Sequence, residues 1–262
     1  MRIGTYNVLG LTGYPAEQSR QEIDGVGSEK NIAHFTRVFS ELKCDVLGLE
    51  EGVAAGHMQK IASGLGRHLA TFPSPIAWPG HVLSRYRIVE SRVFSHRTPD
   101  DEVPPFSRTA GAALLEIDAD TSLWYVVLHL HPGIVELRNV EADIIRDRLN
   151  DLLTVTDHII VVGDLNCEIE ERLHHNLKEM QFANAMETAG GGIQLTMDTV
   201  GINGHAIDHI YVSPSISGRL RSAEIIRQPG FRHDGPQAAG VWVHSDHLPV
   251  VAELDWPNEP TP

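Results

Sequence analysis

The stretch from Val161 to Leu173, VVGDLNCEIEERL, decides how the rest of the chain is interpreted. A continuous apolar run from Ile159 to Val162 indicates a buried strand, and this strand ends at a glycine followed by Asp164 and Asn166. Aspartate and asparagine favour loops and helix N-caps, so turn formation is one explanation for the pair. The alternative is a polar site at the strand end, and the rest of the sequence must distinguish the two.

The same arrangement recurs at other predicted strand ends, where polar side chains suited to metal or phosphate chemistry follow apolar runs. Each one alone has a structural explanation, such as a turn residue or a hydrogen-bonded core histidine. Six such endings in one chain favour a shared site. Besides Asp164 and Asn166, the set comprises Asn7, Glu50 with Glu51, His129 with His131, Asp208 with His209, and the run Ser245, Asp246 and His247.

Strands and helices alternate along the whole chain, which predicts one mixed α/β domain with helices outside layered sheets. We expect this domain to span residues 1–256, followed by a loose tail at 257–262. Helices are predicted at 28–43, 57–66, 139–153 and 169–180, with Ser28 as an N-cap. Strands are predicted at 2–8, 45–51, 80–94, 110–118, 122–132 and 158–166, followed by a hairpin around Asn203 and Gly204 and a last strand before 256.

The composition limits the function classes. The chain has 262 residues and a net charge of −14, which argues against binding nucleic acid through a broad basic surface. Its two cysteines form no CxxC motif, so neither a disulfide framework nor a cysteine-based zinc site is expected. No stretch approaches the ~20 apolar residues of a membrane span. We therefore expect a cytoplasmic protein without a membrane span, acting as a monomer.

Seven short motifs occur in a characteristic order: TYNV, DVLGLEE, GHVLSRYRI, VVLHLHP with Arg138 downstream, VVGDLN, AIDHIYVS and SDHLPV. In order and spacing they resemble the endonuclease/exonuclease/phosphatase superfamily, the deoxyribonuclease I-like metal-dependent phosphohydrolases. The resemblance runs from about Arg2 to Leu254. It implies an α/β (α+β) fold of the deoxyribonuclease I type, a four-layer α/β/β/α sandwich.

The resemblance also implies a metal site and a water-activating acid. Asn7 and Glu51 match the metal-site residues of the family, with Asp246 as a further ligand, and Mg²⁺ or Mn²⁺ suits such oxygen donors. Asp164 matches the residue that orients or deprotonates the attacking water. Asn166 would donate a hydrogen bond to the phosphate oxygens as negative charge develops there.

Three further residues match the phosphate side of the family site. His247 matches the histidine beside the phosphate, and Asp208 matches the carboxylate that orients this imidazole and favours its protonated form. His129 matches a second phosphate-side histidine. For His131, a hydrogen bond at a strand end is the simpler explanation.

The chain departs from the family pattern at two positions. Glu50 precedes the metal glutamate where the family often has glutamine, and Leu128 precedes the first histidine where it often has threonine. Strand alternation would send Glu50 and Glu51 to opposite faces of the sheet, so only one should enter a given site. Which of the two is the metal ligand stays open from the sequence.

These features predict a metal-dependent hydrolase of phosphoester bonds, a phosphodiesterase or phosphatase that attacks phosphorus with water. The acidic balance and the absence of a lysine-rich arm favour a small or lipid-derived phosphoester substrate. A metal-dependent endo- or exonuclease acting on DNA or RNA is the alternative. A catalytically inactive binding module is a third possibility, against which the retained polar residues speak.

Overall fold

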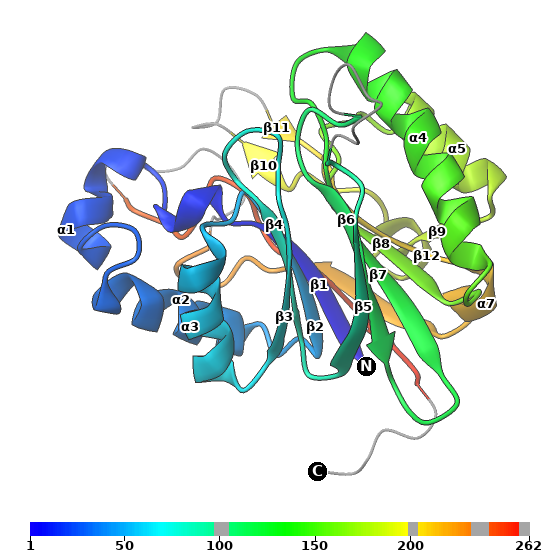
Figure 1. The fold of residues 1–262 in the computed structure, drawn as a ribbon. Helices are drawn as coiled ribbons and strands as arrows, with labels where there is room; N and C mark the ends of the chain where they lie inside the picture. Colours follow the sequence, from blue (N-terminus) through cyan, green and yellow to red (C-terminus); the bar gives the residue numbers. More distant parts are fainter. Residues whose placement is uncertain (97–104, 199–203, 232–240, 257–262) are drawn as a thin grey trace.

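The structure, a computed structural model, describes residues 1–96, 105–198, 204–231 and 241–256. In these parts of the chain, two six-stranded sheets pack face to face with helices on both outer sides (Figure 1). The strand orders are β13-β14-β1-β2-β4-β3 and β5-β6-β7-β8-β12-β9. The predicted four-layer α/β/β/α sandwich is therefore confirmed. The first sheet comprises β1 (Arg2–Asn7), β2 (Val46–Glu50), β3 (His68–Phe72), β4 (Gly80–Ser84), β13 (Leu220–Ile225) and β14 (Val250–Leu254); the second comprises β5 (Arg87–Val93), β6 (Ala110–Glu116), β7 (Ser122–His129), β8 (Ile159–Asp164), β9 (Ala183–Asn184) and β12 (Asp208–Val212).

The central strand β7 shows why the sheets are covered on both faces. Its side chains are almost all buried, and they alternate between two cores. Tyr125 and Val127 point towards the first sheet, where the Tyr125 hydroxyl donates to the carbonyl oxygen of Gly4 at 2.6 Å. Trp124 and Val126 belong instead to the core beneath α4 (Val135–Leu153) and α5 (Arg172–Glu179).

The outer face of the first sheet is covered by α2 (Glu29–Glu41) and α3 (Ala55–Leu65). The predicted N-cap is confirmed: the Ser28 side chain accepts a hydrogen bond from the backbone N–H of Asn31 at 3.0 Å. Shorter helices lie at the ends of the layers. They are η1 (Leu9–Leu11), η2 (Ala16–Gln18), α1 (Ser19–Ile23), α6 (Ala185–Ala189) and α7 (Pro214–Ser217).

The structure corrects two predicted element boundaries. The segment 80–94 is not one strand: the chain turns at Arg85 and Tyr86, so that β4 belongs to the first sheet and β5 to the second. Helix α4 begins at Val135 rather than at 139. Ahead of its first turn, the Nδ1 atom of His131 accepts hydrogen bonds from the backbone N–H groups of Gly133 and Ile134. The strands β3, β9 and β13 and the helices η1, η2, α1, α6 and α7 were not predicted.

Two predictions fall partly outside the described residues. Strands β10 (Met197–Asp198) and β11 (Gly204–His205) pair antiparallel, which agrees with a hairpin. Gly204 belongs to β11 and pairs with Asp198 rather than forming the turn, and residues 199–203 are not described. The predicted tail at 257–262 also lies outside the described residues, and the single domain over 1–256 stays a prediction. Within the described ranges, no helix is both long and apolar enough to cross a membrane.

Gly163 permits the close approach of β7 and β8 immediately before Asp164. A Cβ atom at this position would lie 1.8 Å from the carbonyl oxygen of Leu128, and the φ angle of +147° is also one that L side chains rarely adopt. We therefore expect Gly163→Ala to lower the free energy of unfolding by about 3 kcal/mol or more, measured by urea denaturation.

Gly56 provides the matched control for this substitution. It lies in α3, where an added Cβ meets nothing within 4 Å, so Gly56→Ala should stabilise the helix by about 0.5–1 kcal/mol. Equal stability of the two alanine variants would contradict the proposed strand contact at Gly163.

Candidate active site

The pairing of three strands in the second sheet aligns three predicted site residues. Strand β7 runs parallel to β8 with His129 opposite Asp164, and β12 runs antiparallel to β8 with Asp208 opposite Asp164. Directly paired residues project from the same face of a sheet. His129, Asp164 and Asp208 therefore form a row at one end of the sandwich, and the side chains of all three are buried.

The first sheet contributes residues to the same end. Strands β1 and β2 are parallel, with Asn7 opposite Glu50. The Asn7 side chain crosses between the sheets and donates through Nδ2 to the Oδ2 atom of Asp164 at 2.9 Å. Its Oδ1 atom accepts from the backbone N–H of Leu9 at 3.1 Å, which fixes the orientation of the amide.

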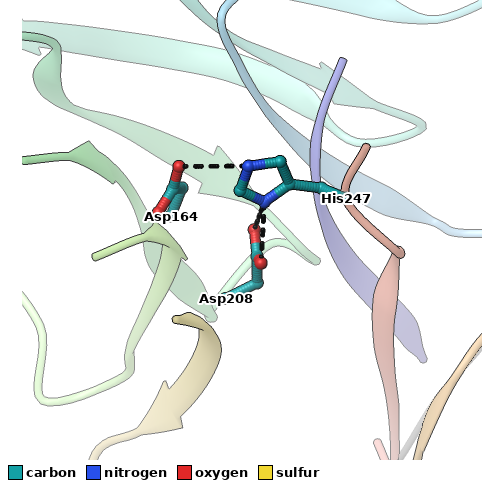
Figure 2. Close-up of side chains that lie close together, drawn as sticks. All are labelled: Asp164, Asp208 and His247. Atoms are coloured by element: carbon teal, nitrogen blue, oxygen red, sulfur yellow. Dashed lines mark hydrogen bonds and ion pairs between the residues drawn. The ribbon is translucent and has the colours of Figure 1, made fainter. Parts of the chain in front are cut away.

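His247 enters the site from the segment that precedes β14 (Figure 2). Its Nδ1 atom lies 2.9 and 3.1 Å from the two carboxylate oxygens of Asp208, and its Nε2 atom lies 3.8 Å from Oδ2 of Asp164. Burial alone would lower the pKa of His247, but the charges of Asp208 and Asp164 outweigh it and raise this pKa well above its ordinary value. The ring is therefore a cation whose Nε2–H faces Asp164.

Two hydroxyl groups hold this arrangement, and one of them was missed in the sequence. Thr196 donates through Oγ1 to Oδ2 of Asp208 at 2.6 Å and accepts the backbone N–H of the same residue at 3.1 Å. Ser245 donates to the carbonyl oxygen of Asn7 at 2.8 Å and accepts the N–H of His247 at 3.2 Å. Thr196 belongs to no motif, so its contact with Asp208 carried no sequence signal.

Glu50 and Glu51 both lie on the site side, so the expectation of opposite faces is wrong. Glu50 ends β2 between the sheets, where Thr5 donates to it at 2.9 Å. Glu51 follows with a φ angle of +50°, which breaks the strand alternation and brings its Oε1 atom to 3.7 Å from Nε2 of His129. The structure thus explains how two consecutive acids can serve one site.

The buried acids oppose one another's ionisation. Burial is the main cause that raises the pKa of Asp164 to about 7, and the charge of Asp208 adds to it. Burial and the charge of Asp208 likewise raise the pKa of Glu50 well above its ordinary value. A cluster with this charge requires protons or a bound cation to balance it.

The donor set fits a hard divalent cation. The Oε2 atoms of Glu50 and Glu51 are both buried and have no hydrogen-bond partner among the residues that the structure describes. Carboxylate and amide oxygens are the ligands that Mg²⁺ and Mn²⁺ prefer. Asp246 accepts a long hydrogen bond from Ser245 at 3.4 Å. Burial is the main cause that raises the pKa of Glu51, and the charge of Asp246 adds to it.

A second group of possible metal ligands also lies at the site. Asp164, Asp208 and His247 offer ligand atoms that all lie within 4.8 Å of one another. We keep Asn7, Glu51 and Asp246 as the predicted metal ligands, because the Nδ1 atom of His247 is already bonded to Asp208.

His129 and Asn166 take positions that refine their predicted roles. Burial, assisted by the charge of His247, lowers the pKa of His129 to about 3, so this imidazole is neutral. Its Nε2 atom lies 3.6 Å from Oδ2 of Asp164. Asn166 has a φ angle of +49°, donates its backbone N–H to Oδ1 of Asp164, and uses Nδ2 to donate to the carbonyl oxygen of Leu130 at 3.0 Å. One amide hydrogen of Asn166 is left for a substrate.

The comparisons with known proteins agree with this architecture. Residues 4–247 match the model of the Endonuclease/Exonuclease/phosphatase family. The chain therefore belongs to this family. No curated protein sequence matches it significantly.

Solved structures share the deoxyribonuclease I-like fold at low sequence identity. A mannosyl-6-phosphatase from Bacteroides thetaiotaomicron is 17% identical with a TM-score of 0.73, covering 98% of this chain and 100% of that one. A 3'-5' exonuclease from Neisseria meningitidis is 18% identical with a TM-score of 0.70 and the same coverage. A functionally unknown conserved protein from Enterococcus faecalis is 17% identical with a TM-score of 0.73, covering 97% of this chain and 99% of that one.

The contacts of Asp164 lead to a prediction that separates catalysis from turn formation. Asparagine can form a turn as well as aspartate, but its amide cannot take a proton from water. We expect Asp164→Asn to lower kcat by about 10²–10⁴-fold on a phosphoester substrate. The melting temperature without metal should stay the same or rise, since a carboxylate is removed from among Glu50 and Asp208.

Asp157 offers the matched control at the opposite end of β8. Its side chain is exposed, so Asp157→Asn should change neither kcat nor the melting temperature. An Asp164→Asn variant that melts much earlier yet keeps its rate would return this residue to a structural role.

The raised pKa values predict how the stability of the metal-free protein depends on pH. The folded-state pKa values of Glu50, Asp164 and His247 all lie above their ordinary values. A group of this kind stabilises the fold below its unfolded pKa and loses that contribution as the pH rises through its folded pKa. With chelator present, the free energy of unfolding of the wild type, taken relative to that of Asp164→Asn, should therefore fall as the pH rises from about 5 to about 8. The difference is needed because buried histidines of lowered pKa, such as His81 and His129, stabilise both proteins as the pH rises.

Urea denaturation at several pH values measures this dependence. Added Mg²⁺ should remove most of the decline in this difference, because a cation replaces the lost protons. A difference between wild type and Asp164→Asn that stays constant or rises with pH in chelator would show that Asp164 ionises normally in the fold.

Proposed function

We propose that this protein is a Mg²⁺- or Mn²⁺-dependent phosphoric ester hydrolase that attacks phosphorus with water. The observation that carries the proposal is the continuous set of contacts from Asn7 through Asp164 and His247 to Asp208. It combines a buried acid of raised pKa with a protonated histidine, which is the pairing that hydrolysis of a phosphoester needs.

Each side chain has a defined part in the proposed reaction. Asp164 orients the attacking water and accepts its proton, which a carboxyl group of pKa about 7 can do near neutral pH. The Nε2–H of His247 donates to a phosphate oxygen, while Asp208 holds the ring in that orientation. Asn166 donates its remaining amide hydrogen to the developing negative charge, and the neutral ring of His129 bounds the phosphate position.

The cation is assigned to three residues. Asn7, Glu51 and Asp246 would hold it, and the two buried oxygens without partners on Glu50 and Glu51 support this placement. A bound Mg²⁺ or Mn²⁺ supplies neutralisation of the charge on the phosphate group.

The proposed substrate is a small or lipid-derived phosphoester rather than nucleic acid. The net charge of −14 gives the chain little general attraction for a polyanion. Among the structural neighbours, one is a mannosyl-6-phosphatase and another a 3'-5' exonuclease, so a nuclease is the alternative. A cytoplasmic location and a monomeric state belong to the proposal on the basis of composition alone.

A substrate screen tests the proposal. The purified protein with Mg²⁺ or Mn²⁺ is assayed against p-nitrophenyl phosphate, bis-p-nitrophenyl phosphate, sphingomyelin, short RNA and plasmid DNA. We expect turnover of a small phosphoester and weak or no nicking of plasmid at ~0.15 M salt, where electrostatic attraction is largely screened. Efficient nicking under those conditions would favour the nuclease.

The Glu51→Gln variant is the control for metal-dependent chemistry. The substitution removes the charge of a metal ligand and leaves the packing of the core unchanged. It should therefore nearly abolish turnover while the circular dichroism spectrum stays the same. Wild-type activity in this variant at limiting Mg²⁺ would move the metal assignment to Glu50. Failure of the wild-type protein to hydrolyse any phosphoester would favour an inactive binding module.

A further inference from the structure

Arg108 lies beside the candidate site, although no motif includes it. Its neighbour Thr109 accepts the backbone N–H of His129 at 2.8 Å, and β6 continues from there in register with β7. This pairing places Arg108 at the site end of the second sheet. The positive charge of Arg108 contributes to the pKa values of both Glu51 and His129, although burial is the main cause of both shifts.

The guanidinium of Arg108 has no carboxylate partner in the part of the chain that the structure describes. Its Nη1 atom donates to the carbonyl oxygen of Ser107 at 3.3 Å, and its Nε atom is buried without an acceptor. Other arginines of this acidic chain are paired, such as Arg138 with Glu171 at 2.7 and 2.8 Å. A half-buried cation with a buried free donor is a binding position for an anion.

A buried carboxylate fixes the backbone at Ser107, immediately before Arg108. Glu141 of α4 is fully buried, and its Oε1 atom accepts both the backbone N–H and the hydroxyl of Ser107 at 2.7 Å. Its Oε2 atom accepts the backbone N–H of His131 at 3.2 Å. One side chain therefore ties the turn that carries Arg108 to the end of β7 that carries His129.

We propose that Arg108 binds a non-bridging phosphate oxygen of the substrate, and that Glu141 is the positioning residue that holds Arg108 towards the site. The proposal rests on the proposed function for the identity of the substrate, a phosphoester. Its geometric basis is separate: a free buried donor, the backbone hydrogen bond from His129 to the residue that follows Arg108, and a rigid support. Arginine suits this role because its planar group can donate to two phosphate oxygens at once.

Binding of inorganic phosphate tests the proposal without turnover. Isothermal titration calorimetry with Mg²⁺ present gives the Kd of phosphate for wild type, Arg108→Gln and Arg108→Lys. We expect Arg108→Gln to raise this Kd by about 10–100-fold, the loss of a charge-assisted hydrogen bond, and Arg108→Lys to recover part of it. The KM for the best substrate of the screen should rise in parallel.

Arg87→Gln is the matched control. Arg87 lies on β5, the strand that pairs with β6. Its side chain is exposed and pairs with Glu116, so its loss should leave phosphate affinity unchanged. The melting temperatures of the Arg87 and Arg108 variants should agree with that of the wild type. An Arg108→Gln variant that binds phosphate as tightly as the wild type would overturn the proposal, as would a wild type that binds no phosphate.

The positioning role is tested by a double-mutant cycle. Glu141→Gln alone should raise the Kd of phosphate, but added to Arg108→Gln it should have no further effect, because it acts only through Arg108. Equal effects in both backgrounds would assign Glu141 a merely structural role. If the wild type hydrolyses phosphoesters and substitution of Arg108 changes nothing, only this inference is wrong. If phosphate binding depends on Arg108 but no phosphoester is hydrolysed, only the proposed function is wrong.

Discussion

The hydrogen bond from Asn7 to Asp164 joins the two sheets at the point where their polar strand ends meet. Both residues have short side chains, so the bond forms only if the sheets approach closely and in one register. Gly48 permits this approach, since a Cβ there would lie 2.6 Å from a methyl group of Val162. The apolar core between the sheets thus sets the position of the site, because it determines which strand ends face each other.

The same packing places two histidines of one site in opposite protonation states. His247 faces the carboxylates of Asp208 and Asp164, and their charges hold its proton. Burial lowers the pKa of His129 to about 3, and the positive charges of His247 and Arg108 add to this effect, so this ring stays neutral. The site therefore has two unlike sides. The protonated ring of His247, the proton donor, lies on the side of β12 and β14, and the neutral ring of His129 ends β7.

The sequence predicted the layers and the end of the sandwich at which the site lies, because apolar periodicity and strand-end polarity are local signals. It could not predict contacts that depend on tertiary structure. Thr196 reaches Asp208 from a loop without a motif, and Arg108 precedes an ordinary strand. Glu51 was misjudged for a different reason: the alternation rule assumes that β2 continues, whereas its positive φ angle ends the strand one residue earlier.

The corner at Arg85 and Tyr86 also affects how this protein behaves towards its own copies. Unpaired sheet edges can recruit strands from other molecules and so begin aggregation. By carrying the chain directly from β4 to β5, the corner brings the edge strands β3 and β5 of the two sheets close together. At the far edges, β9 has only two residues and β13 carries exposed Arg221 and Glu224. A very short edge strand and charged side chains on an edge both hinder a second molecule from extending a sheet there.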